Sequence, residues 1–294
     1  MAKSLASEAS LMGRVEDGFF TASPGVELHY VDIGPEGGRP IIFVHGLTAN
    51  VAFYTPLLHA LAEPWRVVGL DLRGHGLSSK PGGGYTLPVF SRDIRALARH
   101  LDIGSYALVG HCLGALISFY HAAHEPGAVE ALVAIEVPSP VIRPALNRPS
   151  CWACVSLAKA LSRLGSPRRE SVLLSALAPL LPEGMGETLR RWLSSNIVWE
   201  DKASPSWAFS WPGVAEVMRG LLGLDLWGLL KAIRCPVLLI RGSRGLFWAS
   251  DAEEMARLLG ARLMTVRRAG HVVFTVALDV LSGAIRHFLR GALG

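Results

Sequence analysis

One cysteine, Cys112, is set between glycines in a pattern suited to a nucleophile. It lies in the sequence GHCLG at residues 110–114, after an apolar run at 106–109 and before a helix-like run at 115–120. This strand–turn–helix pattern is the nucleophile elbow G-x-S-x-G with cysteine in place of serine. The glycines allow a sharp turn, and the N-terminus of a helix favours a negatively charged sulfur. The motif therefore predicts covalent catalysis by a thiol, and thioester chemistry more than simple ester hydrolysis.

Such a thiol needs a base, because a free cysteine with a pKa of about 8.5 is mostly protonated at neutral pH. His271 follows the last apolar strand, residues 262–266, and is the candidate base. Glu136 ends the apolar run 131–135, so its carboxylate should lie at the same sheet edge and could orient the imidazole. Two alternatives stay open. Glu136 could pair with an arginine of the neighbouring segment, or Cys112 and His271 could act as a dyad.

The elements that must position these residues follow an alternating pattern. Helical stretches separate most of the near-continuous apolar runs, and a leading hairpin is expected at 17–21 and 26–31. This pattern predicts an α/β fold with a mostly parallel sheet covered by helices on both faces. The apolar runs lie at residues 40–44, 66–70, 106–110, 131–135, 236–240 and 262–266.

The alternation breaks in the middle of the chain. We interpret residues 1–136 as the first part of the core, 137–234 as an inserted helical lid, and 235–294 as the second part. The lid should contain helices near 156–164, 171–181, 187–195 and 214–230, and it holds six of the eight tryptophans. These aromatic side chains either pack the lid on the core or line an apolar channel for an acyl chain. The tryptophans expected to contact substrate are Trp152, Trp192, Trp207 and Trp211.

Composition limits the classes of partner. The chain of 294 residues has a net charge of +5, and the segment 137–234, with twelve Lys/Arg and seven Asp/Glu, carries all of it. This basic segment either aids solubility or docks an acidic partner. The chain has no Lys/Arg-rich run typical of nucleic-acid binding, and no apolar stretch reaches the roughly 18 residues of a membrane span.

The cysteines and the first residues bear on location and cofactors. Four cysteines in a chain this long do not suggest a disulfide framework. The N-terminus lacks the apolar core of a signal peptide, so we expect a cytoplasmic protein. The lone C-x-x-C at 151–154 has no second pair of metal ligands near it. We therefore expect no metal and no cofactor.

The chain resembles the α/β-hydrolases in the order of its motifs. The resemblance rests on His45-Gly46 after one strand, the elbow at 110–114 after another, and Gly270-His271 after the last, with the loop DLRGHG at 71–76 between them. It implies that Cys112 is the nucleophile and His271 the base. It also implies an oxyanion hole formed by the backbone amides of Leu47 and Leu113. His45 should hold its own loop in shape, and 71–76 should be a structural loop.

The chain departs from the usual family pattern at the third member of the triad. Most relatives carry an Asp after the strand 236–240, whereas the turn 241–246 contains no carboxylate. Asp251 comes too late and fits a capping box for the next helix, so Glu136 is the better candidate. A cysteine nucleophile with an acid after the earlier strand is similar to the tetramate-forming Dieckmann cyclases. Their acid is Asp where this chain has Glu136.

The resemblance to these cyclases implies a specific reaction and partner. They accept a β-keto acyl chain as a thioester on a carrier protein and release it by ring closure, and an acidic carrier protein would suit the basic lid. The substrate would then be a small-molecule or carrier-bound acyl thioester. Two alternatives remain: a plain hydrolase of esters, lactones or thioesters, and a non-catalytic ligand-binding protein on the same fold.

Overall fold

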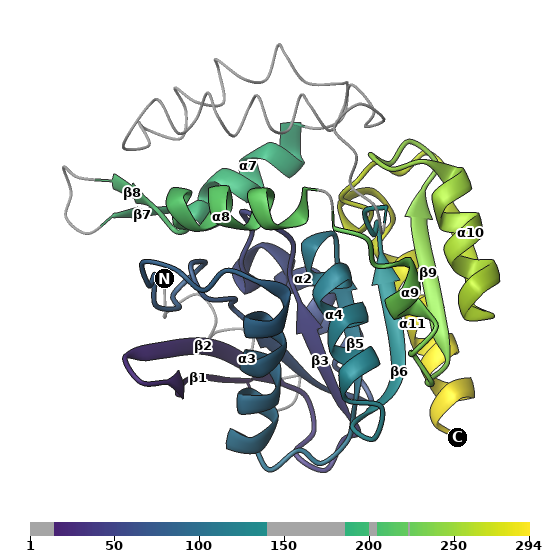
Figure 1. Ribbon diagram of the computed structural model, residues 1–294, viewed down its shortest axis with the longest axis horizontal. Helices are drawn as coiled ribbons and strands as arrows, with labels where there is room; N and C mark the ends of the chain where they lie inside the picture. Colours follow the sequence, from purple (N-terminus) through teal and green to yellow (C-terminus); the bar gives the residue numbers. More distant parts are fainter. Residues whose placement is uncertain (1–14, 140–185, 200–204, 223) are drawn as a thin grey trace.

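The computed structural model describes residues 15–139, 186–199, 205–222 and 224–294. Its centre is an eight-stranded sheet in the order β1-β2-β4-β3-β5-β6-β9-β10 (Figure 1). β2 pairs antiparallel with β1 and β4, and the other neighbours pair in parallel. The strands are β1 (Val15–Ser23), β2 (Val26–Ile33), β3 (Pro40–Val44), β4 (Arg66–Leu70), β5 (Tyr106–His111), β6 (Val129–Ile135), β9 (Val237–Gly242) and β10 (Arg262–Val266).

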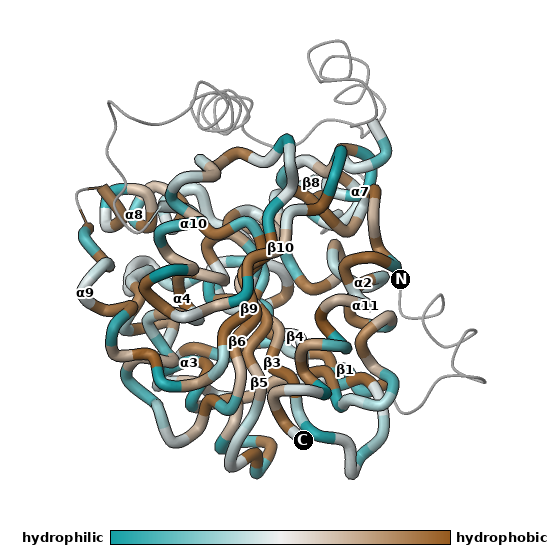
Figure 2. Tube along the Cα trace, turned by 90° about the vertical axis from the view of Figure 1, so that its right-hand side faces the viewer, coloured by the Kyte–Doolittle hydropathy of each residue, from teal (hydrophilic) through white to brown (hydrophobic). Residues whose placement is uncertain are grey.

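Helices cover both faces of the sheet, which confirms the predicted α/β-hydrolase architecture. α3 and α4 pack together on one face with α9 and α10 beside them, and α2 and α11 pack together on the other. The inner strands are buried on both sides, and Figure 2 shows that they are strongly hydrophobic. These helices are α2 (Val51–Leu61), α3 (Leu87–His100), α4 (Leu113–His124), α9 (Trp227–Leu230), α10 (Ala249–Leu259) and α11 (Phe274–Leu293).

The strand order brings the predicted site residues to one end of the sheet. β3 lies between β4 and β5, so the order of connections reverses there. In open α/β sheets, ligands bind outside the carboxyl ends of the strands at such a switch point. The loops after β3, β5, β6 and β10 carry Leu47, Cys112, Glu136 and His271 respectively. All four residues therefore lie beyond the carboxyl ends of parallel strands.

The described segments between residues 186 and 221 of the predicted lid lie over this end of the sheet (Figure 1). It contains α7 (Gly186–Asn196), the hairpin strands β7 (Ile197–Trp199) and β8 (Pro205–Trp207), and α8 (Trp211–Leu221). The hairpin was not predicted. The predicted helices at 156–164 and 171–181 lie outside the described residues. The boundaries of the lid at 137 and 234 stay a prediction.

One predicted helix of this segment is wrong in extent. The range 214–230 was expected to be continuous, but α8 ends at Leu221 and α9 begins at Trp227. Just before α9, the Asp225 carboxylate accepts a hydrogen bond from the Trp227 backbone N–H at 3.0 Å. α9 then packs on the core helices α4 and α10.

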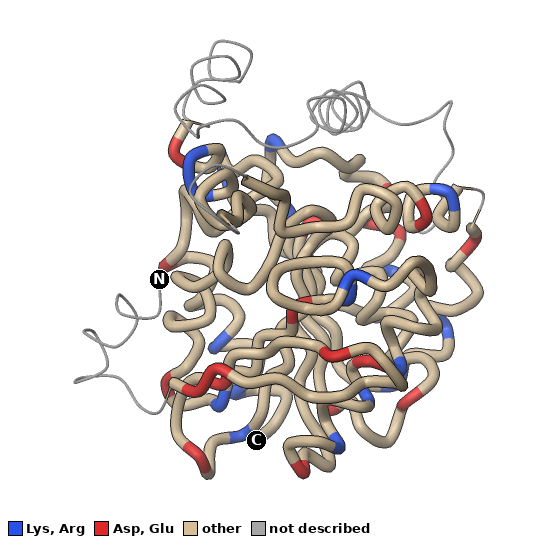
Figure 3. Tube along the Cα trace, turned by 90° about the vertical axis from the view of Figure 1, so that its left-hand side faces the viewer, with Lys and Arg blue, Asp and Glu red and all other residues tan. Residues whose placement is uncertain are grey.

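Among the described residues, no helix is both long and apolar enough to cross a membrane. On the face in Figure 3, Lys and Arg are interspersed with Asp and Glu. Seven of the twelve basic residues of the segment 137–234 lie outside the described ranges, so its expected basic docking face stays a prediction.

Candidate active site

Cys112 occupies a sharp turn between β5 and α4. Its backbone has φ 53° and ψ −115°, in the left-handed region that an L-residue adopts only under constraint. A Cβ on Gly110 would lie 2.5 Å from the carbonyl oxygen of Gly114, and one on Gly114 would lie 2.0 Å from that of Val44. The two glycines of the motif are therefore required for space, and the turn leaves the Cys112 side chain partly exposed.

The side chains of Cys112, His271 and Glu136 meet beyond the sheet. His271 lies next to Cys112, and its Nδ1 lies 3.1 Å from Glu136 Oε2. Burial lowers the pKa of His271, but its interaction with Cys112, followed by that with Glu136, outweighs this effect and raises the pKa to about 10. An imidazole between a thiol and a carboxylate can serve as the base of a nucleophile–base–acid triad.

Glu136 is held in place by the turn that lacks a carboxylate. Its Oε1 accepts a hydrogen bond from the backbone N–H of Gly242 at 2.8 Å, and its Oε2 accepts one from that of Leu246 at 3.1 Å. The side chain is 2% exposed. A Cβ on Gly245 would lie 2.0 Å from Oε1. The turn after β9 therefore surrounds a carboxylate that comes from β6 instead of supplying one itself.

Asp251, the other acid considered, lies elsewhere. It is in the first turn of α10, whose N-cap is Trp248. The expected capping box at Ser250 is wrong, because the N-cap is Trp248 and the helix begins at Ala249, two residues earlier than a cap at Ser250 would place it.

The histidine of the elbow, His111, links His271 to the core. The sequence analysis gave it no role. Its Nε2–H donates to the carbonyl oxygen of His271 at 2.9 Å, and its Nδ1 accepts from the Tyr54 hydroxyl at 2.7 Å. Burial, with the charge of His271 second, lowers the pKa of His111 to about 3, so this imidazole is neutral. The sequence feature that could have pointed to His111 is its place in the elbow motif, next to Cys112.

The turn after β3 lies beside the nucleophile. A Cβ on Gly46 would lie 3.3 Å from Cβ of Cys112, and Leu47 is the next residue of this turn. Among the described residues, the N–H groups of Leu47 and Leu113 have no hydrogen-bond acceptor. Two such donors beside a nucleophile suit a developing oxyanion.

His45 braces this turn from within. It is fully buried, and burial lowers its pKa. Its Nδ1–H donates to the carbonyl oxygen of Gly46 at 2.7 Å, and its Nε2 accepts from the backbone N–H of Leu72 at 3.0 Å. The loop 71–76 is tied down further by a buried ion pair in which Arg73 bonds Asp93 at 2.6 and 2.7 Å.

The tryptophans expected at the site form an aromatic cluster with Phe209. Trp192 and Trp207 lie 5.7 Å apart between ring centroids, and Trp211 lies 4.8 Å from Phe209. Leu47 packs against this cluster, which places it beside the turn after β3. Trp207 is buried, and Trp192 and Trp211 are partly exposed. Trp152 lies outside the described residues.

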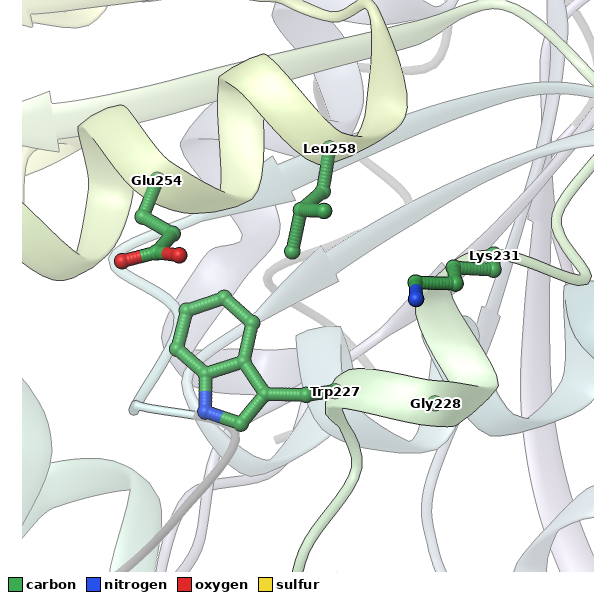
Figure 4. A pocket seen from close by; sticks show the side chains of 5 residues that line it. All are labelled: Trp227, Gly228, Lys231, Glu254 and Leu258. Carbon is green, nitrogen blue, oxygen red and sulfur yellow. The ribbon is translucent and has the colours of Figure 1, made fainter.

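A groove between α9 and α10 lies apart from these residues. Figure 4 shows Trp227 and Lys231 on one side of it and Glu254 and Leu258 on the other. None of the predicted site residues lines it. Among the described residues no group of His, Cys, Asp and Glu is arranged to hold a metal ion.

Comparison with known proteins agrees with this architecture. Residues 39–150 match the family described as alpha/beta hydrolase fold. The chain is 30% identical to the 2-(acetamidomethylene)succinate hydrolase of Mesorhizobium japonicum over 294 residues, which cover 98% of this chain and 99% of the relative. The chain belongs to the α/β-hydrolase family.

Solved structures of α/β-hydrolases superpose on most of the chain. A crystal structure of E-2-(acetamidomethylene)succinate hydrolase has a TM-score of 0.79 at 27% identity and covers 94% of this chain and 100% of that one. A hydrolase from Pseudomonas aeruginosa has a TM-score of 0.74 at 26% identity and covers 93% of this chain and 98% of that one. The similarity therefore extends through both parts of the core.

Proposed function

We propose that this α/β-hydrolase transfers an acyl group through a covalent thioester on Cys112. The observation that carries the proposal is the contact of His271 with both Cys112 and Glu136. In the proposed triad Cys112 is the nucleophile, His271 the general base and acid, and Glu136 the carboxylate that orients the imidazole.

Acylation would begin as His271, whose pKa is raised to about 10, takes the proton of the Cys112 thiol. The Cys112 sulfur attacks the substrate carbonyl carbon, and the carbonyl electron pair moves onto oxygen. The amides of Leu47 and Leu113 would bind this oxyanion. When the intermediate collapses, the bond to the leaving group breaks and His271 returns the proton to the departing oxygen or sulfur. The acyl group remains as a thioester on Cys112.

Release by water makes the protein a hydrolase. His271 takes a proton from a water molecule as its oxygen attacks the thioester, and the collapse frees a carboxylic acid and the Cys112 sulfur. The relatives named 2-(acetamidomethylene)succinate hydrolase support hydrolysis as the outcome. The substrate class is an ester, lactone or thioester of a small molecule.

Ring closure is the second candidate for release. An acidic carrier protein would deliver a β-keto acyl chain, and His271 would take a proton from a carbon of this chain that is activated by its carbonyl groups. The resulting carbanion would attack the thioester carbon in place of water, as in Dieckmann cyclisation, and the carbon–sulfur bond would break to free the Cys112 sulfur. Two observations favour it: the nucleophile is a thiol, and buried aromatic side chains pack against Leu47. An apolar wall next to the nucleophile would limit access of water. Of the predicted substrate-contacting tryptophans, Trp207 and Trp211 belong to this wall.

Intact-protein mass spectrometry tests the proposal. The protein is mixed with p-nitrophenyl acetate or a small β-keto acyl thioester, beside Cys112→Ala, Glu136→Gln and, as a matched control, Cys235→Ala. Cys235 is a suitable control because it is partly buried and burial raises its pKa to about 11. We expect an acyl adduct on the wild type and Cys235→Ala that disappears in Cys112→Ala. Turnover that survives in Cys112→Ala refutes the proposal, and product masses separate hydrolysis from ring closure by one water.

A further inference from the structure

The turn after β3 is fastened to helix α7 of the predicted lid. The indole N–H of Trp192 donates to the carbonyl oxygen of Thr48 at 2.8 Å. Two residues along the chain, the Asn50 side-chain amide donates to the carbonyl oxygen of Ser195 at 2.8 Å. These two bonds bridge segments separated by about half of the chain's length, and both end within four residues of Leu47.

The backbone of this turn contains a residue in an uncommon conformation. Thr48 has φ 57°, in the left-handed region that is uncommon for a β-branched residue. Its hydroxyl donates to the carbonyl oxygen of Leu47 at 2.7 Å, which is a local bond within the turn. The bond from Trp192 is the long-range one, and it is made to the carbonyl of the residue in the unusual conformation. The peptide whose carbonyl Trp192 bonds also carries the N–H of Ala49, which donates to the carbonyl oxygen of Gly46 at 3.2 Å. The Gly46–Leu47 peptide carries the N–H of Leu47, so the bond from Trp192 acts on this amide through the Ala49–Gly46 bond.

Asn50 fastens the other end of the turn. Its Oδ1 accepts from the backbone N–H of Phe53 at 3.1 Å, which caps α2, while its Nδ2 serves α7. It is 2% exposed, and its neighbour Asn196 in α7 is fully buried. Asn196 donates in turn to the carbonyl oxygen of Trp192 at 2.9 Å. The contact with α7 is therefore a buried, hydrogen-bonded joint.

We infer that Trp192 is a positioning residue: helix α7 sets the oxyanion-binding amide of Leu47 through the bond from Trp192 to Thr48, with Asn50 as the second point of attachment. This inference rests on the proposed function, because it takes Leu47 as an oxyanion donor. It gives Trp192 a role through the backbone rather than as a wall for the acyl chain. The oxyanion hole is then complete only with α7 packed on the turn.

This role separates two reactions of the same sulfur. Acylation by p-nitrophenyl acetate passes through a tetrahedral oxyanion, whereas alkylation by iodoacetamide is a direct displacement that needs the sulfur alone. Loss of one oxyanion donor lowers rates by about 100-fold to 1,000-fold in a serine protease. A donor that is displaced rather than removed should cost about tenfold to 100-fold. Alkylation of Cys112 should not change.

The test uses Trp192→Phe, which keeps an aromatic ring and removes the indole N–H. Asn50→Asp is the second variant, because a carboxylate still caps α2 but repels the Ser195 carbonyl. Trp199→Phe is the matched control, since Trp199 follows the same helix and is 47% exposed. For each protein, acylation of Cys112 is measured with acetyl and hexanoyl p-nitrophenyl esters and alkylation with iodoacetamide, after thermal unfolding has confirmed a folded chain.

We expect acylation to fall about tenfold or more in Trp192→Phe and Asn50→Asp, equally for both esters, with alkylation and Trp199→Phe unchanged. Acylation that stays at the wild-type rate in both folded variants overturns the inference. A loss confined to the hexanoyl ester also overturns it, because it would make Trp192 a substrate contact. Failure of the proposed function is distinct: Cys112→Ala would then leave ester turnover intact.

Discussion

Replacement of Gly245 by alanine should disable the proposed triad without changing any residue that it contains. The backbone of Gly245 lies outside the left-handed region, so alanine meets no conformational penalty there. The obstacle is the Glu136 carboxylate. The new Cβ would lie 2.0 Å from Oε1, 2.4 Å from Oε2 and 2.5 Å from Cδ. The three atoms nearest to the new Cβ all belong to Glu136, so we expect the effect of the substitution to act through this carboxylate.

The size of the effect follows from these distances. Ordinary van der Waals contact begins at 3.4 Å, so the carboxylate must retreat by about 1.4 Å from its place 2.0 Å from the new atom. Its bonds to Gly242 at 2.8 Å and to Leu246 and His271 at 3.1 Å cannot all survive such a shift. A misplacement of about 1 Å costs about 100-fold in rate, which corresponds to about 2.7 kcal/mol of transition-state stabilisation.

A double-mutant cycle is the assay. kcat/KM is measured with p-nitrophenyl acetate for wild type, Gly245→Ala, Glu136→Ala and the double variant. We expect a loss of about 100-fold for Gly245→Ala and at least as much for Glu136→Ala. In the double variant alanine at 245 should add nothing, because the carboxylate with which it collides is absent. Thermal unfolding of each variant checks that the loss is not one of folding.

Two results would refute this reasoning. Gly245→Ala could keep its activity within about threefold of wild type, which would mean that the position of the carboxylate does not limit the rate. The same loss could also occur with and without Glu136, which would place the effect in the turn itself.

A gain of activity in Glu136→Gly/Gly245→Asp over Glu136→Gly would further support a carboxylate site that either strand can fill.

Three other predictions concern the surroundings of the site. Because the pKa of His271 is raised from 6.5 to about 10 in the folded protein, its contribution to stability is complete below pH 6.5 and is lost as the pH rises towards 10. In Cys112→Ser the NMR titration midpoint of this imidazole should move down, and an unchanged midpoint would contradict the contact between His271 and Cys112. Tyr54→Phe leaves Nδ1 of His111 without its proton donor, so urea unfolding should show a loss of about 1–3 kcal/mol, and no loss would argue against that bond. Asp93→Ala strands the buried guanidinium of the loop 71–76 and should cost about 3–5 kcal/mol by the same method, while activity per folded molecule persists if the loop is structural.

The fold and the types of reactive group at the site are encoded in local patterns of the sequence. The apolar runs are long enough to be strands and alternate with helices, and buried parallel strands require this near-continuous hydrophobicity. The glycines around Cys112 have no room for a side chain, so their spacing was readable as a turn. These signals are local: each depends on residues within about ten positions of one another.

The way in which the site residues are held depends on tertiary contacts. The turn after β9 was visible in the sequence as one without an acid, but only the packing of β6 against β9 showed that its amides bind Glu136. The roles of His111 and Trp192 depend on bonds to backbone carbonyls 160 and 144 residues away. A backbone carbonyl has no residue type, so no sequence pattern records which side chain will bond it. The chain encodes its reactive groups locally, and their alignment arises from contacts that exist only once the sheet and α7 are in place.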